Sequence, residues 1–209
     1  MAKGPLIMTT SKFTTSYALA SQALARADPE KMARLAGGVY EPAQRTITIE
    51  MCARPISYLL DQQILIWADT GEDFVETPAD IPILHYLQNA NGARPTGEWL
   101  PYRELWGANA QSGPFIARHE ARLAEKYGSD PGAVLAAAAR IKARVTEQSG
   151  DARIEVDFFP NVTMAAALYA PDEELPAEAK ILYDAVIKEY LPTEDAIGVA
   201  ETLTKRLTS

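Results

Sequence analysis

The chain has 209 residues, 47% of them hydrophobic, which is enough to bury the core of one large domain or two small ones. The net charge of −8 opposes general binding to phosphate backbones, and no basic run offsets it, so we exclude nucleic acid as a partner. No apolar run approaches the roughly 18 residues of a membrane-spanning helix, so we expect no membrane insertion. The single cysteine, Cys52, cannot form an intrachain disulfide or hold an iron–sulfur cluster alone, and we therefore expect a cytoplasmic protein without an intrinsic cluster.

The N-terminal region predicts a tail and two helices. Residues 1–12 have no periodicity and are predicted to be a loose tail, followed by a single α+β domain over residues 13–209. Apolar residues at helical spacing predict a first helix from about Thr14. Asp28-Pro29-Glu30 then combines a capping residue, a first-turn proline and an acid suited to the helix dipole. This sequence predicts a second short helix that ends at Gly37-Gly38.

Two regions have the period of β-strands. Arg45–Glu50 alternates strictly, and with its neighbours it predicts antiparallel hairpins near residues 39–68, which place Cys52 in a strand. Residues 152–169 contain two further apolar runs around the turn signal Pro160-Asn161. Because strands occur in hairpin clusters rather than alternating with helices, we predict an α+β fold with a small antiparallel sheet and about six or seven helices.

Helical patterns fill most of the remaining sequence. Asp80 is predicted to cap a helix that contains His85, and the stripe from Val134 to Val145 predicts another. Pro176 is predicted to open an amphipathic helix that ends at Leu191-Pro192, because proline suits a first helical turn and the residue before proline leaves the helical region. A last helix is predicted from about Glu194.

Between these helices, residues 93–114 break every period and are rich in aromatic side chains. Such a segment is either an ordered flap over the core or a binding loop, and we favour the binding loop. His85 precedes it, so an axial imidazole and stacked rings can hold a planar cofactor. Arg103-Glu104 can orient an acidic ligand, or can form an internal ion pair. The predicted ligand-binding residues are His85, Tyr86, Trp99, Tyr102, Arg103, Glu104 and Trp106.

Acidic residues cluster before the helix predicted from Pro176. Asp172, Glu173, Glu174 and Glu178 can bind a hard divalent cation through their oxygens. Alternatively, they stabilise the positive end of the predicted helix. The same carboxylates with Asp184 can also serve acid–base catalysis. No phosphate-binding loop, nucleophile elbow or complete metal-ligand motif is present.

Three sequence blocks carry a family resemblance. LHYLQNANGARPTGEWLPYREL from Leu84, YAPDEELPAEAKILYD from Tyr169 and EYLPTED from Glu189 resemble, in order and spacing, domain of unknown function 3786, which occurs mostly in anaerobic bacteria and archaea. The resemblance implies no activity. Some members carry an additional iron–sulfur domain related to that of corrinoid proteins, which this chain lacks. The resemblance implies a link to anaerobic metabolism and to corrinoid chemistry. The planar cofactor considered for His85 and the aromatic segment can be a corrinoid or haem.

The sequence leaves three functional hypotheses. The first is a cytoplasmic accessory protein that binds a tetrapyrrole cofactor or a metalloprotein or corrinoid-protein partner. The second is an adaptor or subunit that docks on a larger enzyme through the aromatic segment, because Trp, Tyr and Arg concentrate binding energy at interfaces. The third is a small acid–base enzyme that uses the carboxylates at residues 172–184.

Overall fold

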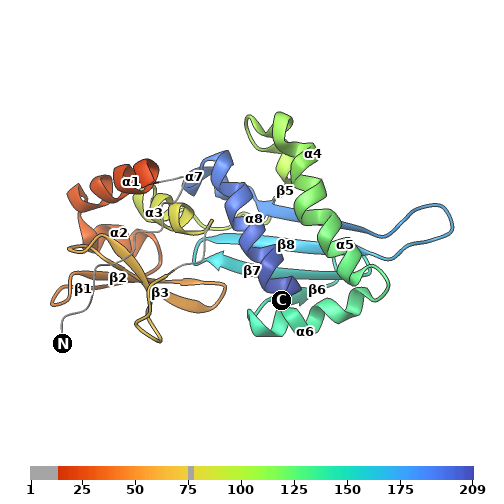
Figure 1. Cartoon of the computed structure of the whole chain (residues 1–209), viewed down its shortest axis with the longest axis horizontal. Coiled ribbons are helices and arrows are strands. Elements are labelled where there is room, and N and C mark those ends of the chain that lie inside the picture. Colours follow the sequence, from red (N-terminus) through yellow and green to blue (C-terminus); the bar gives the residue numbers. More distant parts are fainter. Residues whose placement is uncertain (1–13, 75–77) are drawn as a thin grey trace.

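The computed structural model describes residues 14–74 and 78–209, and the tail predicted at residues 1–12 lies outside them. Over the described residues the fold is α+β, as predicted, with two antiparallel sheets of four and five strands (Figure 1). The helices are α1 (Thr14–Arg26), α2 (Pro29–Leu35), α3 (Asp80–Gln88), α4 (Ser112–Phe115), α5 (Ala121–Tyr127), α6 (Val134–Arg140), α7 (Ile187–Tyr190) and α8 (Thr193–Thr208). The strands are β1 (Val39–Glu41), β2 (Thr46–Met51), β3 (Arg54–Leu59), β4 (Ile64–Trp67), β5 (Trp99–Pro101), β6 (Arg144–Thr146), β7 (Ala152–Phe159), β8 (Val162–Tyr169) and β9 (Glu178–Asp184). No helix formed by these residues is long and apolar enough to cross a membrane.

The first sheet is a meander in the order β1-β2-β3-β4, which confirms the hairpins predicted near residues 39–68. Before it, α2 begins as predicted, because the Asp28 side chain accepts hydrogen bonds from the backbone N–H groups of Glu30 and Lys31. Cys52 lies in the turn between β2 and β3 rather than in a strand. Cys52 and Ala53 both have left-handed backbone, with φ of 48° and 62°, which costs a non-glycine residue about 1–2 kcal/mol.

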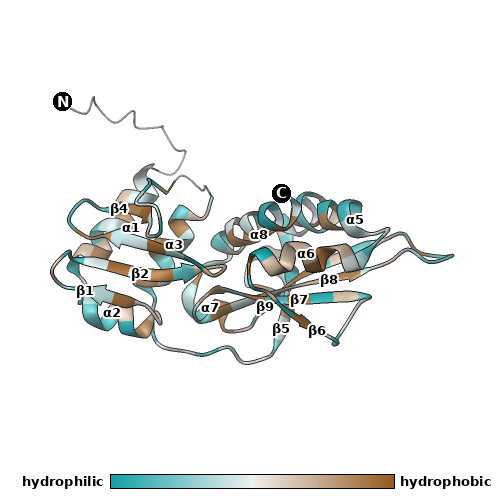
Figure 2. Ribbon diagram, turned by 90° about the horizontal axis from the view of Figure 1, so that it is seen from below, coloured by the Kyte–Doolittle hydropathy of each residue, from teal (hydrophilic) through white to brown (hydrophobic). Residues whose placement is uncertain are grey.

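The second sheet has the order β5-β9-β8-β7-β6, and its β7–β8 pair confirms the hairpin predicted near residues 152–169. Strand β8 lies at the centre and is buried over Val162–Leu168. Helices α5, α6 and α8 cover one side of this sheet (Figure 2). The connection between β8 and β9 projects beyond the helices as a long hairpin (Figure 1).

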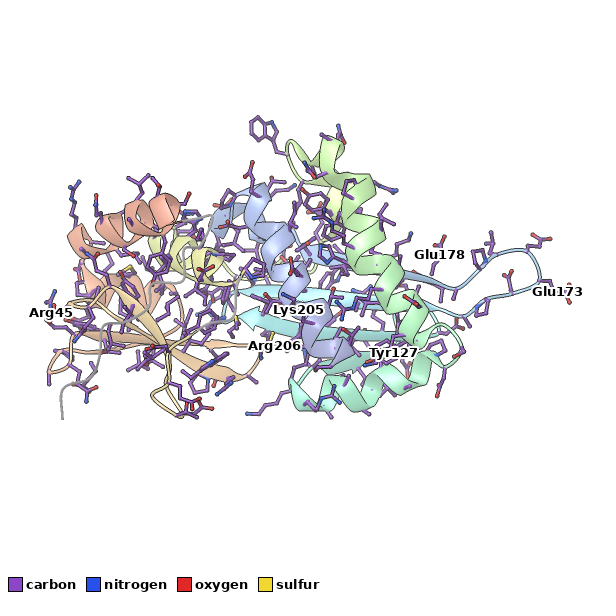
Figure 3. The ribbon with its side chains drawn as sticks, viewed as in Figure 1. Arg45, Tyr127, Glu173, Glu178, Lys205 and Arg206 are labelled. Atoms are coloured by element: carbon purple, nitrogen blue, oxygen red, sulfur yellow. The ribbon has the colours of Figure 1, made fainter. Side chains whose placement is uncertain are left out.

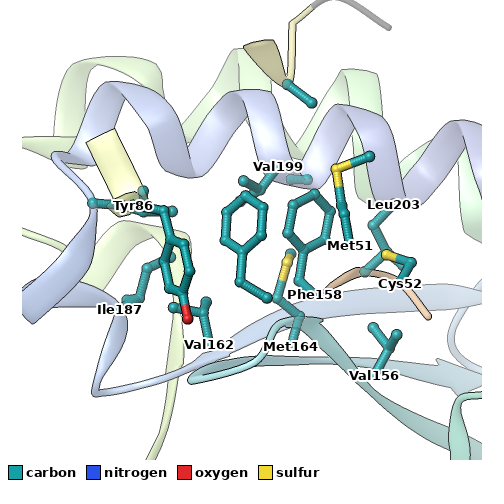
Figure 4. Close-up of a cluster of buried hydrophobic side chains, with 14 of the residues drawn as sticks. Met51, Cys52, Tyr86, Val156, Phe158, Val162, Met164, Ile187, Val199 and Leu203 are labelled. Carbon is teal, nitrogen blue, oxygen red and sulfur yellow. The ribbon is translucent and has the colours of Figure 1, made fainter. Parts of the chain in front are cut away.

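The two sheets are joined by a shared apolar core. The Cys52 N–H donates to the Phe158 carbonyl of β7 at 3.0 Å, so the β2–β3 turn inserts beside the second sheet. Around this contact, Met51, Cys52 and Phe158 gather next to Leu203 of α8 in one buried cluster (Figure 4). The strained turn is stabilised by this burial, since Cys52 is only 2% exposed. One continuous cluster of buried side chains therefore spans both sheets.

The prediction of a helix from Pro176 to Leu191 is wrong for most of these residues. Glu178–Asp184 forms strand β9, and only Ile187–Tyr190 is helical, as α7. Residues such as Glu, Ala, Lys and Leu favour helices, but tertiary context overrides this preference. The backbone of the buried strand β8 needs hydrogen-bonding partners on both edges. Strand β9 pairs with one of these edges, along Met164–Tyr169 of β8. Ala179, Ile181 and Tyr183 are all buried, with the period of two that a strand requires.

The helix predicted through Val145 is also too long. Helix α6 ends at Arg140, and Lys142 then adopts left-handed backbone with φ of 51° before β6 begins. Val145 lies in β6 and is exposed, so the apolar stripe that suggested helix continues into a strand. The irregular segment at residues 93–114 likewise contains a short strand, β5, that pairs with β9.

Candidate functional site

The aromatic segment is anchored to the second sheet by one buried carboxylate. Asp184, 1% exposed at the end of β9, accepts hydrogen bonds from the backbone N–H groups of Thr96, Gly97 and Val186 at 2.9, 2.6 and 2.9 Å. The Thr96 hydroxyl donates a fourth at 3.0 Å. Four donors satisfy both carboxylate oxygens, so Asp184 fixes the loop that leads into β5. This environment gives Asp184 a structural role rather than one in acid–base catalysis.

Farther along the segment, the backbone forces Trp106 outward. Leu105 and Ala108, on either side, are 5% and 1% exposed, whereas Trp106 is 91% exposed. The Thr193 hydroxyl at the start of α8 donates to the Trp106 carbonyl at 2.7 Å. Gly107 then turns the chain with φ of 77°, a conformation that favours glycine. The indole is therefore presented to solvent from a fixed backbone.

A groove lies beside this indole. It has a volume of about 290 Å³ and is formed by the 105–107 segment and by the connection from α7 to α8. Apolar side chains form most of it, and Lys188 and Glu194 add one charge of each sign. We define the Trp106 surface as Trp106 together with the groove residues Ile187, Lys188, Leu191, Pro192 and Glu194. Of the groove, sequence reasoning missed Ile187, Leu191 and Pro192, although the Leu-Pro break at 191–192 marked the place.

The other predicted aromatic residues do not join this surface. Tyr86 is fully buried; its hydroxyl donates to the Ala36 carbonyl and accepts from the Asn161 N–H. Tyr102 is 3% exposed and stacks on Phe115, with ring centroids 4.4 Å apart. Core packing explains the positions of both rings, and hydrogen bonds of the hydroxyl add to it at Tyr86. They leave no open slot in which a planar cofactor is gripped between them.

Trp99 and the charged pair after it are also separate from Trp106. The Trp99 ring in β5 lies under the guanidinium of Arg153, with 4.7 Å between the guanidinium carbon and the ring centroid. Arg103 and Glu104 are both exposed and form no ion pair with each other, so the internal ion pair weighed from the sequence is absent from this described segment. Arg103 instead borders a small depression with Lys180 and Glu120.

His85 contacts the first turn of α8. Its Nδ1 hydrogen-bonds the Asp195 carboxylate at 2.7 Å, and the His85 side chain is 27% exposed. This hydrogen bond raises the pKa of His85, and burial opposes the rise. Nearby Asp80 was predicted to cap α3, but it lies inside the first helical turn and makes no capping hydrogen bond. Burial raises the pKa of the Asp80 carboxyl, and Asp195 adds to the rise.

The His85–Asp195 contact predicts a pH-dependent stability. A raised histidine pKa stabilises the fold fully below the unfolded value of about 6.5 and loses this contribution as pH rises through the folded pKa. We expect His85→Ala to lower the free energy of unfolding at pH 6 by about 1.5–3 kcal/mol, and by less at pH 8.5. Urea unfolding across this range measures the difference.

His85→Asn is the matched variant, because it keeps a donor near the Nδ1 position but cannot be protonated. It should lose the pH dependence with a smaller loss of stability. His119, the other histidine, has a pKa lowered by burial, so it changes the free energy of unfolding with pH in the opposite direction. This change is present in wild type and variant alike, and it cancels when the two are compared. A difference between wild type and His85→Ala that is the same at pH 6 and pH 8.5 would contradict the assignment.

The predicted acidic metal site is spread along a hairpin. Glu173 lies on the projecting β8–β9 connection and Glu178 at the start of β9 (Figure 3). Asp172 caps the connection by accepting hydrogen bonds from the N–H groups of Glu174 and Leu175. Glu178 pairs with Lys180 in β9. Among the described residues, no group of three or more His, Cys, Asp or Glu side chains is arranged to hold a metal ion. Stabilisation of a following helix is excluded too, because a strand follows.

The same geometry weakens the acid–base hypothesis. Glu178 and Asp184 are the first and last residues of the seven-residue strand β9, so six steps of extended backbone, about 20 Å, separate them. Asp184 is buried at one end of β9, whereas the 172–174 carboxylates are exposed beyond the other end. These groups therefore do not face one substrate together.

Comparison with known proteins tests the family resemblance. The family model DUF3786, a domain of unknown function, matches residues 28–206. The chain belongs to the DUF3786 family. No curated protein and no solved structure matches it. Within residues 93–114 of this DUF3786 chain, Trp106 is the most exposed large apolar side chain, at 91%.

Proposed function

We propose that this DUF3786 chain is an accessory protein that docks on a partner protein through the Trp106 surface. The observation that carries the proposal is the 91% exposure of Trp106 on a backbone fixed by Leu105, Ala108 and Thr193. Leaving a large aromatic side chain in water forgoes about 1.5–3 kcal/mol of burial, and such side chains concentrate binding energy at interfaces. A projecting indole beside a groove suits a partner that offers one apolar pocket and one apolar side chain.

Charge narrows the kind of partner. The net charge of −8 repels nucleic acid and anionic membrane surfaces, so the exposed indole is better suited to a protein than to either of these. The docking face of that protein is expected to be neutral or basic around its apolar pocket. A chain with one cysteine has no intrachain disulfide, which is typical of proteins in reducing compartments. We therefore expect the partner to be cytoplasmic. The family resemblance suggests a metalloprotein or corrinoid protein of anaerobic metabolism.

Trp106→Ala is the test of the proposal. Photo-crosslinking from position 106 in the source cells identifies the partner, and calorimetry with the purified partner measures the affinity. We expect Trp106→Ala to weaken binding by about 2 kcal/mol or more, which is roughly thirtyfold in Kd, since the indole is the central anchor. Its own free energy of unfolding should change by less than about 0.5 kcal/mol, because the side chain is exposed.

Val39→Ala is the matched control, because Val39 is 70% exposed but lies on β1 of the first sheet. It should leave the affinity unchanged. In a chain whose other tryptophans are replaced by phenylalanine, Trp106 emission should shift to the blue on binding as the indole leaves water. Equal affinities for wild type and Trp106→Ala would reject the Trp106 surface as the docking site.

A second candidate function is binding of haem or a cobamide through His85. The hydrogen bond from Nδ1 to Asp195 favours it, since histidines that ligate metals donate their other ring N–H to a carboxylate. This leaves Nε2 as the ligating atom. Adding either compound should then change its absorbance spectrum, and His85→Ala should abolish the change. Identical spectra with wild type and variant would remove this candidate.

A further inference from the structure

Another depression, of about 300 Å³, lies between the helix that continues into α5 and the last helix, α8. Arg118, His119 and Arg122 line one side of it, and Glu201, Thr204 and Lys205 line the other. Figure 3 shows Lys205 on α8, next to α5. Thr204 is about 16 Å along α8 from Thr193, so this depression is separate from the Trp106 surface.

The depression is cationic on an acidic protein. Three of its side chains carry a positive charge and one, Glu201, a negative charge, and Glu201 pairs with Lys205 at 2.7 Å. Arg118 and Arg122 form no ion pair or hydrogen bond with any residue that the structure describes. Two like charges four residues apart on one helix repel each other. Both guanidinium groups therefore remain available to an anion.

Two buried polar atoms form the inner wall. His119 and Thr204 are 3% and 1% exposed, and neither His119 Nε2 nor Thr204 Oγ1 has a hydrogen-bond partner among the described residues. Buried polar atoms without partners are costly and rare, so their presence in the same depression calls for an explanation. Burial lowers the pKa of His119; Glu201 opposes this shift, and Arg118, Arg122 and Lys205 add to it. The lowered pKa favours the neutral ring, which has one N–H to donate.

The local helix geometry explains why His119 faces the depression. Residues Ile116–Glu120 form a π-helix, a rare widened turn that is frequent at functional sites. The widened turn allows two consecutive side chains, His119 and Glu120, to be buried. Glu120 turns to the second sheet, where its carboxylate accepts from the Ile181 N–H at 3.0 Å. His119 instead lines the depression beside α8.

We propose that this depression binds a dianionic phosphate group, either as free phosphate or as the phosphoryl end of a small phosphomonoester. Arg118 and Arg122 would make the charge-assisted contacts, since the planar guanidinium matches phosphate oxygens in pairs. His119 Nε2 and the Thr204 hydroxyl would donate from the inner wall. The volume is at the lower end of the range for ligand pockets, which suits a phosphate with little attached to it.

The two histidines of the chain make a direct test possible. Nuclear magnetic resonance resolves both imidazole rings during titration with inorganic phosphate at constant ionic strength, with glycerol phosphate as a second probe. We expect the His119 ring signals to shift with saturation and those of His85 to stay in place. Tighter binding of glycerol phosphate supports a phosphomonoester, and equal or weaker binding supports free phosphate. A His119 ring that does not respond to either probe at tens of millimolar overturns the proposal.

Variants confirm the location. Arg118→Gln and Arg122→Gln should each weaken phosphate binding by about tenfold or more, because each removes a charge-assisted contact. Arg26→Gln, an exposed position in the last turn of α1, makes the same change of charge elsewhere and should have no effect. Wild-type affinity in both pocket variants would overturn the proposal. Trp106→Ala should bind phosphate normally, so this result stands independently of the docking proposal.

Discussion

Asp184→Ala is expected to lower the free energy of unfolding by about 3–5 kcal/mol, a large part of the total stability of a typical domain. Its buried carboxylate accepts four hydrogen bonds from Thr96, Gly97 and Val186, and no other acceptor replaces it in the variant. Each buried donor left without a partner costs about 1–3 kcal/mol. Urea unfolding of the wild type and the variant measures the loss.

The loss should be accompanied by a local change in the aromatic segment. Asp184 and Trp99 are paired residues of β9 and β5, so releasing the 96–97 loop should expose Trp99 and shift its emission to the red. Asp172→Ala is the control, because Asp172 also accepts two backbone hydrogen bonds but lies exposed on the hairpin. We expect a smaller loss there. A loss at Asp184 no greater than that at Asp172 would mean that the buried carboxylate does not hold the segment.

Local chemistry explains what the sequence predicted correctly. The strict alternation of Arg45–Glu50 could be satisfied only by a half-buried strand, and Asp28-Pro29 specified the start of α2 through groups no more than three residues apart. These signals are short-range, so they do not depend on the rest of the fold. The assignment of Glu178–Asp184 failed for the opposite reason, because its strand is imposed by the edge of β8.

The candidate site shows the same limit. The sequence correctly marked residues 93–114 as unusual, but it could not distinguish Tyr102, which is 3% exposed, from Trp106, which is 91% exposed, because both lie in one irregular segment. The contact of His85 with Asp195 joins residues 110 positions apart. The phosphate proposal depends on the approach of Arg122 to α8 and on a π-helix. The only local signal for it was the pair of arginines around His119.

The contact between the two sheets is expected to contribute strongly to stability. Phe158 is fully buried in β7, and its carbonyl accepts from the Cys52 N–H of the first sheet. Phe158→Ala removes most of a side chain that packs against residues from both sheets, and we expect the free energy of unfolding to fall by about 3–5 kcal/mol. Phe158→Leu, which preserves more of the volume, should lose less. Urea unfolding with two separate fluorescence probes measures both effects.

The two probes also test whether residues 13–209 form one domain, which stays a prediction. Trp67 reports on the first sheet and Trp99 on the second, and each is followed in a chain where the other tryptophans are phenylalanine. Because one cluster of buried side chains spans both sheets, and because Arg206 of α8 lies 5.6 Å from the Trp67 ring, we expect a single transition at both probes. Phe158→Ala should then lower both midpoints equally. If the Trp99 transition moves while the Trp67 transition stays in place, the sheets unfold separately, and the chain has two domains that share a contact rather than one.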